Sequence, residues 1–306
     1  MRALVTGVNG FVGKHLVREL GSRGDEVVGI GREASPAPEI EELLADYWVC
    51  DLMDKEAVGK LPLEDIGEVI SLAGLAGVGD SFSDSDKYKA INVAVLTNLL
   101  QTLIDKNLKP RVIAVSTGAV YKPAQPLPLT EDSKLAEVSP YATSKLMMER
   151  AVEGFRTKGL EIIIVRPFNH IGPGQEPGFL VPDLYTRIVT AQKTGQPIKV
   201  GNLSTRRDYT DVRDVARAYD DLVHAKELKH NLYNICSGKS VSGQEILDKL
   251  LVLMGVSVGV EPDPALMRPN DNPDLYGSYQ RLHSQTGWQP QIRLEKTLAD
   301  FVASAS

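Results

Sequence analysis

Two residues that could exchange protons lie four positions apart in the stretch SPYATSKLMMER, residues 139–150. Ser139 is suited to cap a helix and Pro140 to begin one, so the spacing predicts a helix with Tyr141 and Lys145 on one face. A phenol with a pKa of about 10 exchanges protons poorly at neutral pH, but an ammonium about 5 Å away stabilises its phenolate by roughly 3 kcal/mol. The pair therefore predicts an acid–base site, although a tyrosine packed on a lysine stem gives the same spacing.

Two hydroxyl side chains stand at the end of an apolar run in VSTGAVYK, residues 115–122. They belong to Ser116 and Thr117, and Gly118 and Ala119 follow them where carboxylates could stand. We expect the Thr117 hydroxyl, with that of Ser116 as the alternative, to bind the substrate oxygen that the tyrosine protonates.

A third chemical motif is rich in glycine and opens the chain, in VTGVNGFVGKHL, residues 5–16. Its glycines follow an expected strand and begin an expected helix, which is the setting of a dinucleotide pyrophosphate site. Glycines also punctuate ordinary turns, so the flanking elements carry the prediction. The residues expected to bind the cofactor here are Gly7, Gly10, Phe11, Val12 and Gly13.

The end of the second expected strand, GIGRE, bears on the choice of cofactor. An NAD site usually has an acid at this point, which binds the ribose 2′-hydroxyl, but this chain has Gly31 and Arg32 there. The planar guanidinium can pair with a 2′-phosphate, so Arg32 favours NADP(H). NAD(H) stays possible, because Glu33 could take the place of the acid.

These side chains need a framework of strands and helices to bring them together. The first two-thirds of the chain alternate short apolar runs with helical stretches, a pattern typical of a parallel sheet covered on both faces. The expected fold is α/β: a doubly wound parallel sheet of Rossmann type with a smaller C-terminal lobe. The cofactor domain would comprise 1–170 plus about 200–235, and the substrate lobe about 171–199 and 236–306.

Composition excludes several other functions. The formal net charge of −6 and the absence of a dense basic block argue against nucleic acid binding. No apolar run approaches the roughly 18 residues that span a bilayer, and the N-terminus enters a strand instead of a signal peptide, so we expect a cytoplasmic protein without membrane contact. Cys50 and Cys236 are isolated, and the five histidines are scattered, so neither a disulfide nor a metal site is expected.

The GxxGxxG spacing and the Ser/Thr, Tyr and Lys set resemble the extended short-chain dehydrogenase/reductases, and the resemblance covers nearly the whole chain. It implies that two further pairs of residues line the adenine and the pyrophosphate. It also implies a homodimer, built by pairing the helices near 92–104 and 140–155 into a four-helix bundle. The implied additional cofactor residues are Asp51 and Leu52, and Ala73 and Gly74.

The resemblance also indicates which reactions the chain lacks. The sugar-nucleotide dehydratases of this superfamily carry an Asp–Glu pair after the threonine, where this chain has Gly118 and Ala119. Epimerisation at carbons 3 and 5, which uses a Cys and a His, is not expected, because only His170 is placed near the expected site. The site is therefore expected to transfer hydride without eliminating water.

The loop RPFNHIGPGQEPGFLVPDL resembles that of the GDP-4-keto-6-deoxy-D-mannose reductases, a nucleotide-sugar branch of this superfamily. This resemblance implies reduction of a GDP-linked 4-keto-6-deoxyhexose with NAD(P)H to GDP-D-rhamnose. A nucleotide-sugar 4-epimerase with tightly bound NAD is the alternative, and a non-catalytic NADP-binding regulator a weaker one. The expected substrate residues are Ser116, Asn169, Lys193, Arg207, Arg268 and Asp271.

Overall fold

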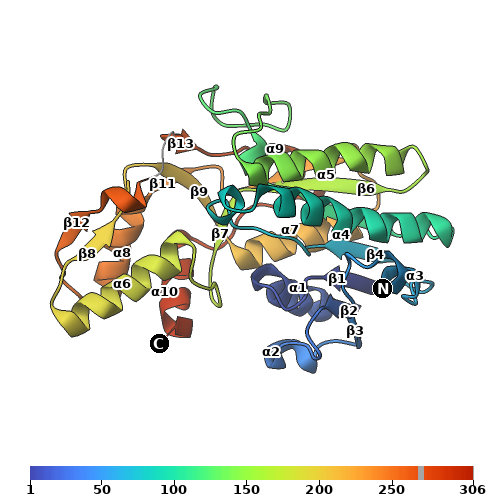
Figure 1. Cartoon of the computed structure of the whole chain (residues 1–306), viewed down its shortest axis with the longest axis horizontal. Helices are drawn as coiled ribbons and strands as arrows, with labels where there is room; N and C mark the ends of the chain where they lie inside the picture. Colours follow the sequence, from blue (N-terminus) through green and yellow to red (C-terminus); the bar gives the residue numbers. More distant parts are fainter. Residues whose placement is uncertain (268–271, 306) are drawn as a thin grey trace.

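The computed structural model describes residues 1–267 and 272–305. Its centre is a seven-stranded parallel sheet in the order β10-β6-β5-β4-β1-β2-β3 (Figure 1). Six of its strands coincide with the short apolar runs noted in the first two-thirds of the chain, and a seventh is added from further along, so the doubly wound fold is confirmed. The strands are β1 (Arg2–Thr6), β2 (Glu26–Gly31), β3 (Asp46–Val49), β4 (Glu68–Ser71), β5 (Arg111–Val115), β6 (Ile162–Pro167) and β10 (Leu232–Ile235).

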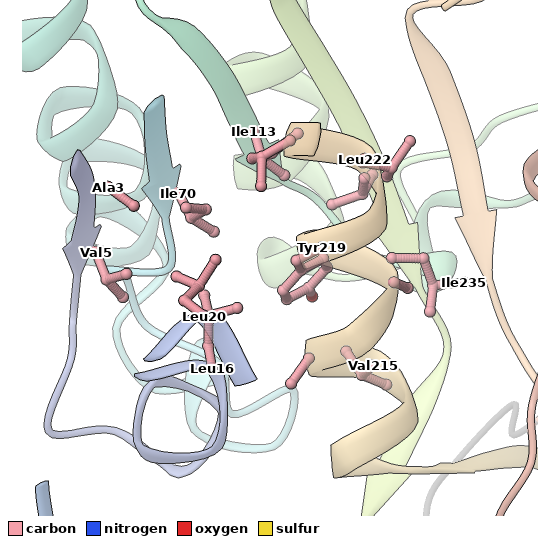
Figure 2. Packing of buried hydrophobic residues seen from close by; sticks show 14 of the residues in the cluster. Ala3, Val5, Leu16, Leu20, Ile70, Ile113, Val215, Tyr219, Leu222 and Ile235 are labelled. Carbon is pink, nitrogen blue, oxygen red and sulfur yellow. The ribbon is translucent and has the colours of Figure 1, made fainter. Parts of the chain in front are cut away.

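Helices cover both faces of this sheet because its strands are apolar on both sides. Leu4 packs in a core with α4 and α5, whereas Ala3 and Val5 pack in a second core with α1 and α7. Figure 2 shows Leu16 of α1 and Tyr219 of α7 within that second core. The covering helices are α1 (Phe11–Ser22), α2 (Pro38–Glu41), α3 (Lys55–Gly59), α4 (Ser85–Asp105), α5 (Pro140–Arg156), α7 (Val212–His224) and α9 (Gln280–Thr286).

A smaller lobe with its own apolar core lies beside the large sheet (Figure 1). In it β9 pairs with β7, β11 and β13, and β8 pairs with β12. Its strands are β7 (Asn169–Ile171), β8 (Ile198–Val200), β9 (Arg206–Asp211), β11 (Ser240–Ser242), β12 (Val260–Pro262) and β13 (Asp274–Leu275). Its helices are α6 (Leu180–Thr194), α8 (Gly243–Met254) and α10 (Leu294–Ala305), and short 3₁₀ turns occur at Asp80–Phe82, Gly118–Val120 and Pro264–Leu266.

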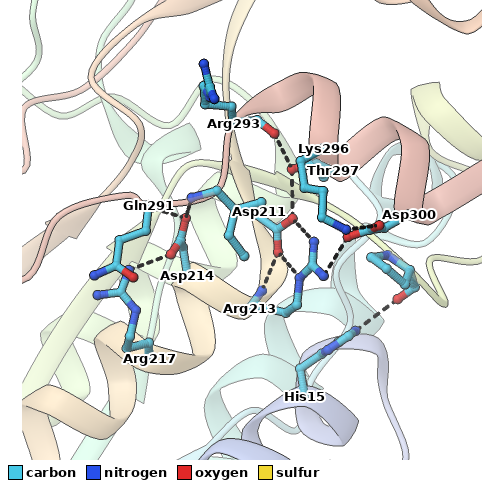
Figure 3. Close-up of polar contacts among 12 residues, drawn as sticks. His15, Asp211, Arg213, Asp214, Arg217, Gln291, Arg293, Lys296, Thr297 and Asp300 are labelled. Atoms are coloured by element: carbon cyan, nitrogen blue, oxygen red, sulfur yellow. Dashed lines mark hydrogen bonds and ion pairs between the residues drawn. The ribbon is translucent and has the colours of Figure 1, made fainter. Parts of the chain in front are cut away.

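The chain crosses between the two parts more than once. Leu282 and Trp288, which fall by number in the expected lobe, pack in the core of the large domain with α7. At the start of α7, Arg213 binds Asp211 and reaches Asp300 of α10 at 2.8 Å (Figure 3). This polar junction fixes the lobe against the sheet.

Among the described residues, no helix combines the length and the apolarity needed to cross a membrane.

Candidate active site

The glycine-rich turn between β1 and α1 has the geometry that a pyrophosphate site needs. Gly7 has a φ of +67°, which a residue with a side chain adopts at a cost. A Cβ on Gly13 would lie 2.5 Å from the carbonyl oxygen of Val8, so only glycine allows this contact between helix and turn. Gly10 caps α1 without a side-chain bond, and no acid stands in the first turn. The backbone N–H groups at Phe11 and Val12 can therefore face an anion.

The other expected cofactor residues lie at the same carboxyl edge of the sheet. The Ala73 N–H donates to Thr6 Oγ1 at 3.1 Å, which ties the end of β4 to β1. A Cβ on Gly74 would lie 3.8 Å from Lys145 Nζ, so the turn after β4 meets helix α5 here. After β3, the Asp51 carboxylate accepts from the Met53 N–H, and Leu52 is buried.

The ribose end of the expected cofactor site is organised around the Glu33 carboxylate. This group accepts hydrogen bonds from Asn9 Nδ2 and from the Arg32 N–H, each at 3.1 Å. A hydrogen bond from its own backbone N–H, together with these two, lowers the pKa of Glu33. The Tyr47 hydroxyl donates to the Glu33 carbonyl, which fixes the loop further. Arg32 itself is exposed, so its side chain can meet a group that approaches from solvent.

Three side chains converge where β5 ends and α5 begins. Ser139 caps α5 as expected, with its hydroxyl accepting from the Ala142 N–H, and Pro140 is the first helical residue. The Thr117 side chain faces the Tyr141 phenol and acts to lower its pKa. One turn later, Lys145 Nζ donates to the carbonyl of Val115 at 2.8 Å. The structure therefore brings the three expected catalytic residues together.

Burial sets the proton affinities of this pair. It raises the pKa of Tyr141 to about 12, and the interaction with Thr117 opposes that rise. It also lowers the pKa of Lys145 to about 8, and the charge of Glu149 opposes that change. At neutral pH the phenol is thus protonated and can donate, whereas the expected lowering of its pKa by Lys145 stays a prediction.

Glycine at position 118 is explained by the packing around it. A Cβ there would lie 2.9 Å from the ring of Phe168, which follows β6. A carboxylate side chain at this position would therefore require the ring to move. The position directly after Thr117 therefore has no acid, and the packing of Phe168 against it disfavours one.

The structure corrects the expected role of Ser116. This residue is buried, and its hydroxyl donates to the Glu149 carboxylate rather than standing free for a substrate. Glu149 in turn binds Arg166 through both of its oxygens, at 3.0 and 2.7 Å. The sequence reasoning missed Glu149 and Arg166, although a charged residue in the apolar run IIIVRP was a usable signal.

A buried amide on α4 was also missed. Asn92 Oδ1 accepts from the Leu75 N–H at 2.7 Å, and its Nδ2 donates to Ser144 Oγ at 2.9 Å. One side chain therefore joins the turn after β4 to the catalytic helix. An amide within the apolar stretch INVAVL was the available signal.

The first part of the expected substrate region lies beside the glycine-rich turn between β1 and α1. Asn169 is exposed at the start of β7, where it pairs with Tyr209 of β9. The next residue, His170, stacks on the ring of Phe11 with centroids 6.0 Å apart. Burial lowers the pKa of His170, so the ring is neutral at physiological pH. Asn169 is thus placed at the junction of the two parts.

The two arginines of β9, Arg206 and Arg207, bind different partners. Arg206 binds Glu245 at 2.9 Å, and that glutamate also completes the cap of α8. Arg207 instead donates to the carbonyl of Asn272 at 2.7 Å, directly after the segment that contains Asp271. The expected residues Arg268 and Asp271 lie outside the described part of the chain.

Lys193 is not brought to this region. It is exposed in the last turn of α6, a helix that packs on α8 and β8 and runs to the outer end of the lobe (Figure 1). The expectation of a fourth diphosphate contact failed here because the length of α6 carries its end away from the large sheet.

Known proteins are similar to this chain along its whole length. The chain is 33% identical to GDP-6-deoxy-D-mannose reductase of Pseudomonas aeruginosa over 302 residues, which cover 97% of this chain and 94% of the relative. It is 27% identical to UDP-glucose 4-epimerase of Lactobacillus helveticus, over 100% of this chain and 96% of that protein. The solved structure of RMD from P. aeruginosa complexed with NADPH superposes with a TM-score of 0.84 at 31% identity, covering 99% and 98% of the two chains.

The family comparison agrees with the fold. Residues 3–236 match the NAD dependent epimerase/dehydratase family, a span that runs from β1 to the end of β10. The matched span includes the glycine turn, Thr117, Tyr141 and Lys145. The chain therefore belongs to the NAD dependent epimerase/dehydratase family, and is an NAD(P)-dependent enzyme of oxidoreductase type.

Proposed function

We propose that this protein reduces the 4-keto group of GDP-4-keto-6-deoxy-D-mannose with NAD(P)H and forms GDP-D-rhamnose, that is, GDP-6-deoxy-D-mannose. The observation that carries the proposal is the site at the end of β5. It places Tyr141 beside Thr117, and an acid at position 118, as in a dehydratase, would require the ring of Phe168 to move. The reductase relative at 33% identity supports the same reaction.

Each catalytic residue has a distinct task in this reduction. When bound, the cofactor supplies the hydride that carbon 4 receives. Tyr141 donates its phenolic proton to the carbonyl oxygen, and the Thr117 hydroxyl orients that oxygen. Lys145 holds positive charge behind the phenol and stabilises the phenolate that remains. Water then has to return the proton to Tyr141.

The proposed cofactor is NADP(H), with NAD(H) possible. The exposed guanidinium of Arg32 can approach a 2′-phosphate, whereas the Glu33 carboxylate is already bound by Asn9 and by the backbone. The NADPH complex of the P. aeruginosa protein supports this choice. Replacing Arg32 by Ala should raise the KM for NADPH and leave the KM for NADH nearly unchanged. An equal rise for both cofactors would contradict the role of Arg32.

The proposed substrate contacts lie in the lobe. Arg207 would bind the diphosphate, together with Arg268, and Asp271 would bind the nucleoside ribose. Asn169 would hydrogen bond the sugar or a phosphate. The binding of Arg207 to the carbonyl of Asn272 supports this group, because it ties β9 to the residue directly after Asp271.

A 4-epimerase is the second candidate, because the UDP-glucose 4-epimerase of L. helveticus matches along the whole chain. The two reactions differ in what they consume. An epimerase returns the hydride to its product, so the purified protein would hold NAD tightly and need no added cofactor. A reductase consumes one NAD(P)H for each sugar.

One assay tests the proposal. The protein is incubated with NADPH and GDP-4-keto-6-deoxy-D-mannose, and NMR assigns the configuration at carbon 4 of the product. We expect stoichiometric oxidation of NADPH and the rhamno configuration. A talo product would overturn the stereochemistry. Brisk reduction of a dTDP- or UDP-linked ketosugar, without turnover of the GDP sugar, would overturn the choice of nucleotide.

A further inference from the structure

Successive turns of α5 hold three consecutive residues at the end of β5. The three helix residues are spaced four apart, so they lie along one face of α5. Their partners supply a hydroxyl, a backbone carbonyl and a second hydroxyl. The pairs are Tyr141 with Thr117, Lys145 with Val115, and Glu149 with Ser116.

The third contact is the most firmly anchored. The Glu149 side chain is only 10% exposed and that of Arg166 only 4%, so their ion pair is shielded from water. Arg166 donates to both oxygens of Glu149, a geometry that fixes the carboxylate in position as well as direction. The Ser116 N–H also bonds to the carbonyl of Val165, next to Arg166, so the strand end is held from both sides.

A chain of hydrogen bonds extends this anchor to the edge of the sheet. Arg166 donates to the Tyr121 hydroxyl at 3.2 Å and lies 5.0 Å from the centre of its ring. Tyr121 then donates to Asn234 Oδ1 of β10 at 2.6 Å. Burial opposes the charge of Arg166, but its contacts with Glu149 outweigh burial and raise the pKa of Arg166. Because every link is made, Glu149 has little freedom to move.

We propose that Glu149 is a positioning residue for catalysis: it fixes the strand end that carries Thr117 and places a buried carboxylate one turn of α5 from Lys145. Glu149 touches neither substrate nor cofactor in this role. Its action on rate rests on the proposed reduction, whereas its action on Lys145 does not.

The effect of Glu149 on Lys145 depends on the burial of this face of α5. Lys145 is buried and its pKa falls to about 8, and the carboxylate one turn away opposes that fall. Removing the carboxylate should lower this pKa further. If the pKa of Lys145 falls by 1, the protonated fraction drops to about one tenth of its former value at any pH well above the midpoint.

The test replaces Glu149 by Gln, which keeps the shape and removes the charge. The matched control is Glu153→Gln on the same helix, because Glu153 is 63% exposed and binds Arg156 instead. The protonation of Lys145 is followed by NMR of lysine labelled with ¹³C at Cε, and the Lys145→Arg variant identifies its signal. We expect the midpoint to fall in Glu149→Gln and to stay in Glu153→Gln.

A second variant guards against a folding defect, since Glu149→Gln leaves the buried Arg166 without its partner. Glu149→Gln combined with Arg166→Met removes both charges and should shift Lys145 in the same direction but by less, because the lost guanidinium also disfavoured the ammonium. A Lys145 midpoint that is unchanged in a folded variant without the Glu149 carboxylate would overturn the proposal.

Kinetics separate this proposal from the proposed function. In Glu149→Gln we expect kcat at pH 8 to fall about fivefold for a pKa lower by 1, with the alkaline limb of its pH profile moved to lower pH. If Lys145 shifts but the unaltered protein reduces no GDP ketosugar, only the proposed substrate fails. If Lys145 shifts and kcat follows the wild-type pH profile, the positioning role fails.

Discussion

At the scale of the residue, Tyr141 is the proton donor of the proposed reaction, and its replacement by Phe removes only one hydroxyl. We expect kcat to fall by at least about 100-fold, because general acid catalysis typically contributes a factor of that size or more. Binding of NADPH, followed by its fluorescence, should change little. Tyr185→Phe in the lobe is the control, since its hydroxyl bonds the carbonyl of Ala305 far along the chain. Full activity in Tyr141→Phe would eliminate the mechanism.

The pKa of Lys145 predicts a pH dependence. Burial lowers this pKa to about 8, so the ammonium is lost as the pH rises through that value. The proposed mechanism needs the ammonium, and therefore kcat/KM should fall on the alkaline side with a midpoint near 8. The phenol, with a pKa of about 12, stays protonated over the same range. A profile that is flat from pH 7 to 10 would contradict the assigned role of Lys145.

At the scale of the element, α1 offers a matched pair of glycines. Gly13 touches the backbone of the turn, whereas a Cβ on Gly21 would meet no atom within 4 Å. We expect Gly13→Ala to destabilise the protein by about 3 kcal/mol, since backbone atoms have to shift. Gly21→Ala should stabilise it by up to about 1 kcal/mol, because alanine favours a helix. Urea unfolding measures both, and equal effects would refute the close contact.

The opposite end of the sheet gathers a second set of charges. His224 at the end of α7 places one ring nitrogen 3.0 Å from Asp25 and the other 3.0 Å from Asp220. Glu68 on β4 is buried nearby, and the pKa of His224 is raised because its hydrogen bond to the Asp220 backbone carbonyl and the charges of the three carboxylates together outweigh burial. Each ring nitrogen faces a carboxylate, which suits an imidazolium between two acids better than a metal ligand.

This set predicts how stability changes with pH. Burial raises the pKa of Glu68 and raises that of Asp220 to about 6. The folded chain thus binds these protons more tightly than the unfolded chain, so their contribution is complete below about pH 4, the ordinary carboxyl value, and is lost as the pH rises through about 6. The contribution of His224 is lost at higher pH in the same direction.

Glu68→Gln tests this pH dependence, because the amide cannot ionise. The Tm of the variant minus the Tm of the unaltered protein should increase as the pH rises from 5 to 8. The charges that face Glu68 include the N-terminal amine and Arg111, which both favour its ionised form. Glu26→Gln at the exposed start of β2 is the control. A Tm difference that does not vary with pH would argue against a buried, titrating Glu68.

At the scale of the whole molecule, we expect a homodimer formed through α4 and α5. Met147 of α5 is 37% exposed, whereas its neighbours Met148 and Val152 are buried in the core. Met147→Glu should therefore weaken the dimer, while Val252→Glu on α8, at an 81% exposed position, should not. Light scattering checks the mass against twice 33.4 kDa. A monomer at micromolar concentration in the unaltered protein would count against the dimer.

Local chemistry let the sequence alone predict the fold class and the grouping of Thr117, Tyr141 and Lys145. The six apolar runs became strands, because a stretch buried on both faces is apolar whatever surrounds it. Ser139 capped the helix that brings Tyr141 and Lys145 onto one face, and this too depends only on neighbours in the chain. Arg166 in the strand IIIVRP and Asn92 in α4 stand out in the sequence as polar residues in apolar stretches, but the sequence does not identify their partners.

Tertiary structure decided everything that depends on contacts between distant segments. It directed the Ser116 hydroxyl to Glu149, gathered Asp25, Asp220 and His224 from scattered positions, and exposed one methionine of α5 while burying the next. Helical periodicity places a residue on a face but does not say what covers that face. The site is thus predictable where neighbours in sequence make it, and not where the sheet brings remote charges together.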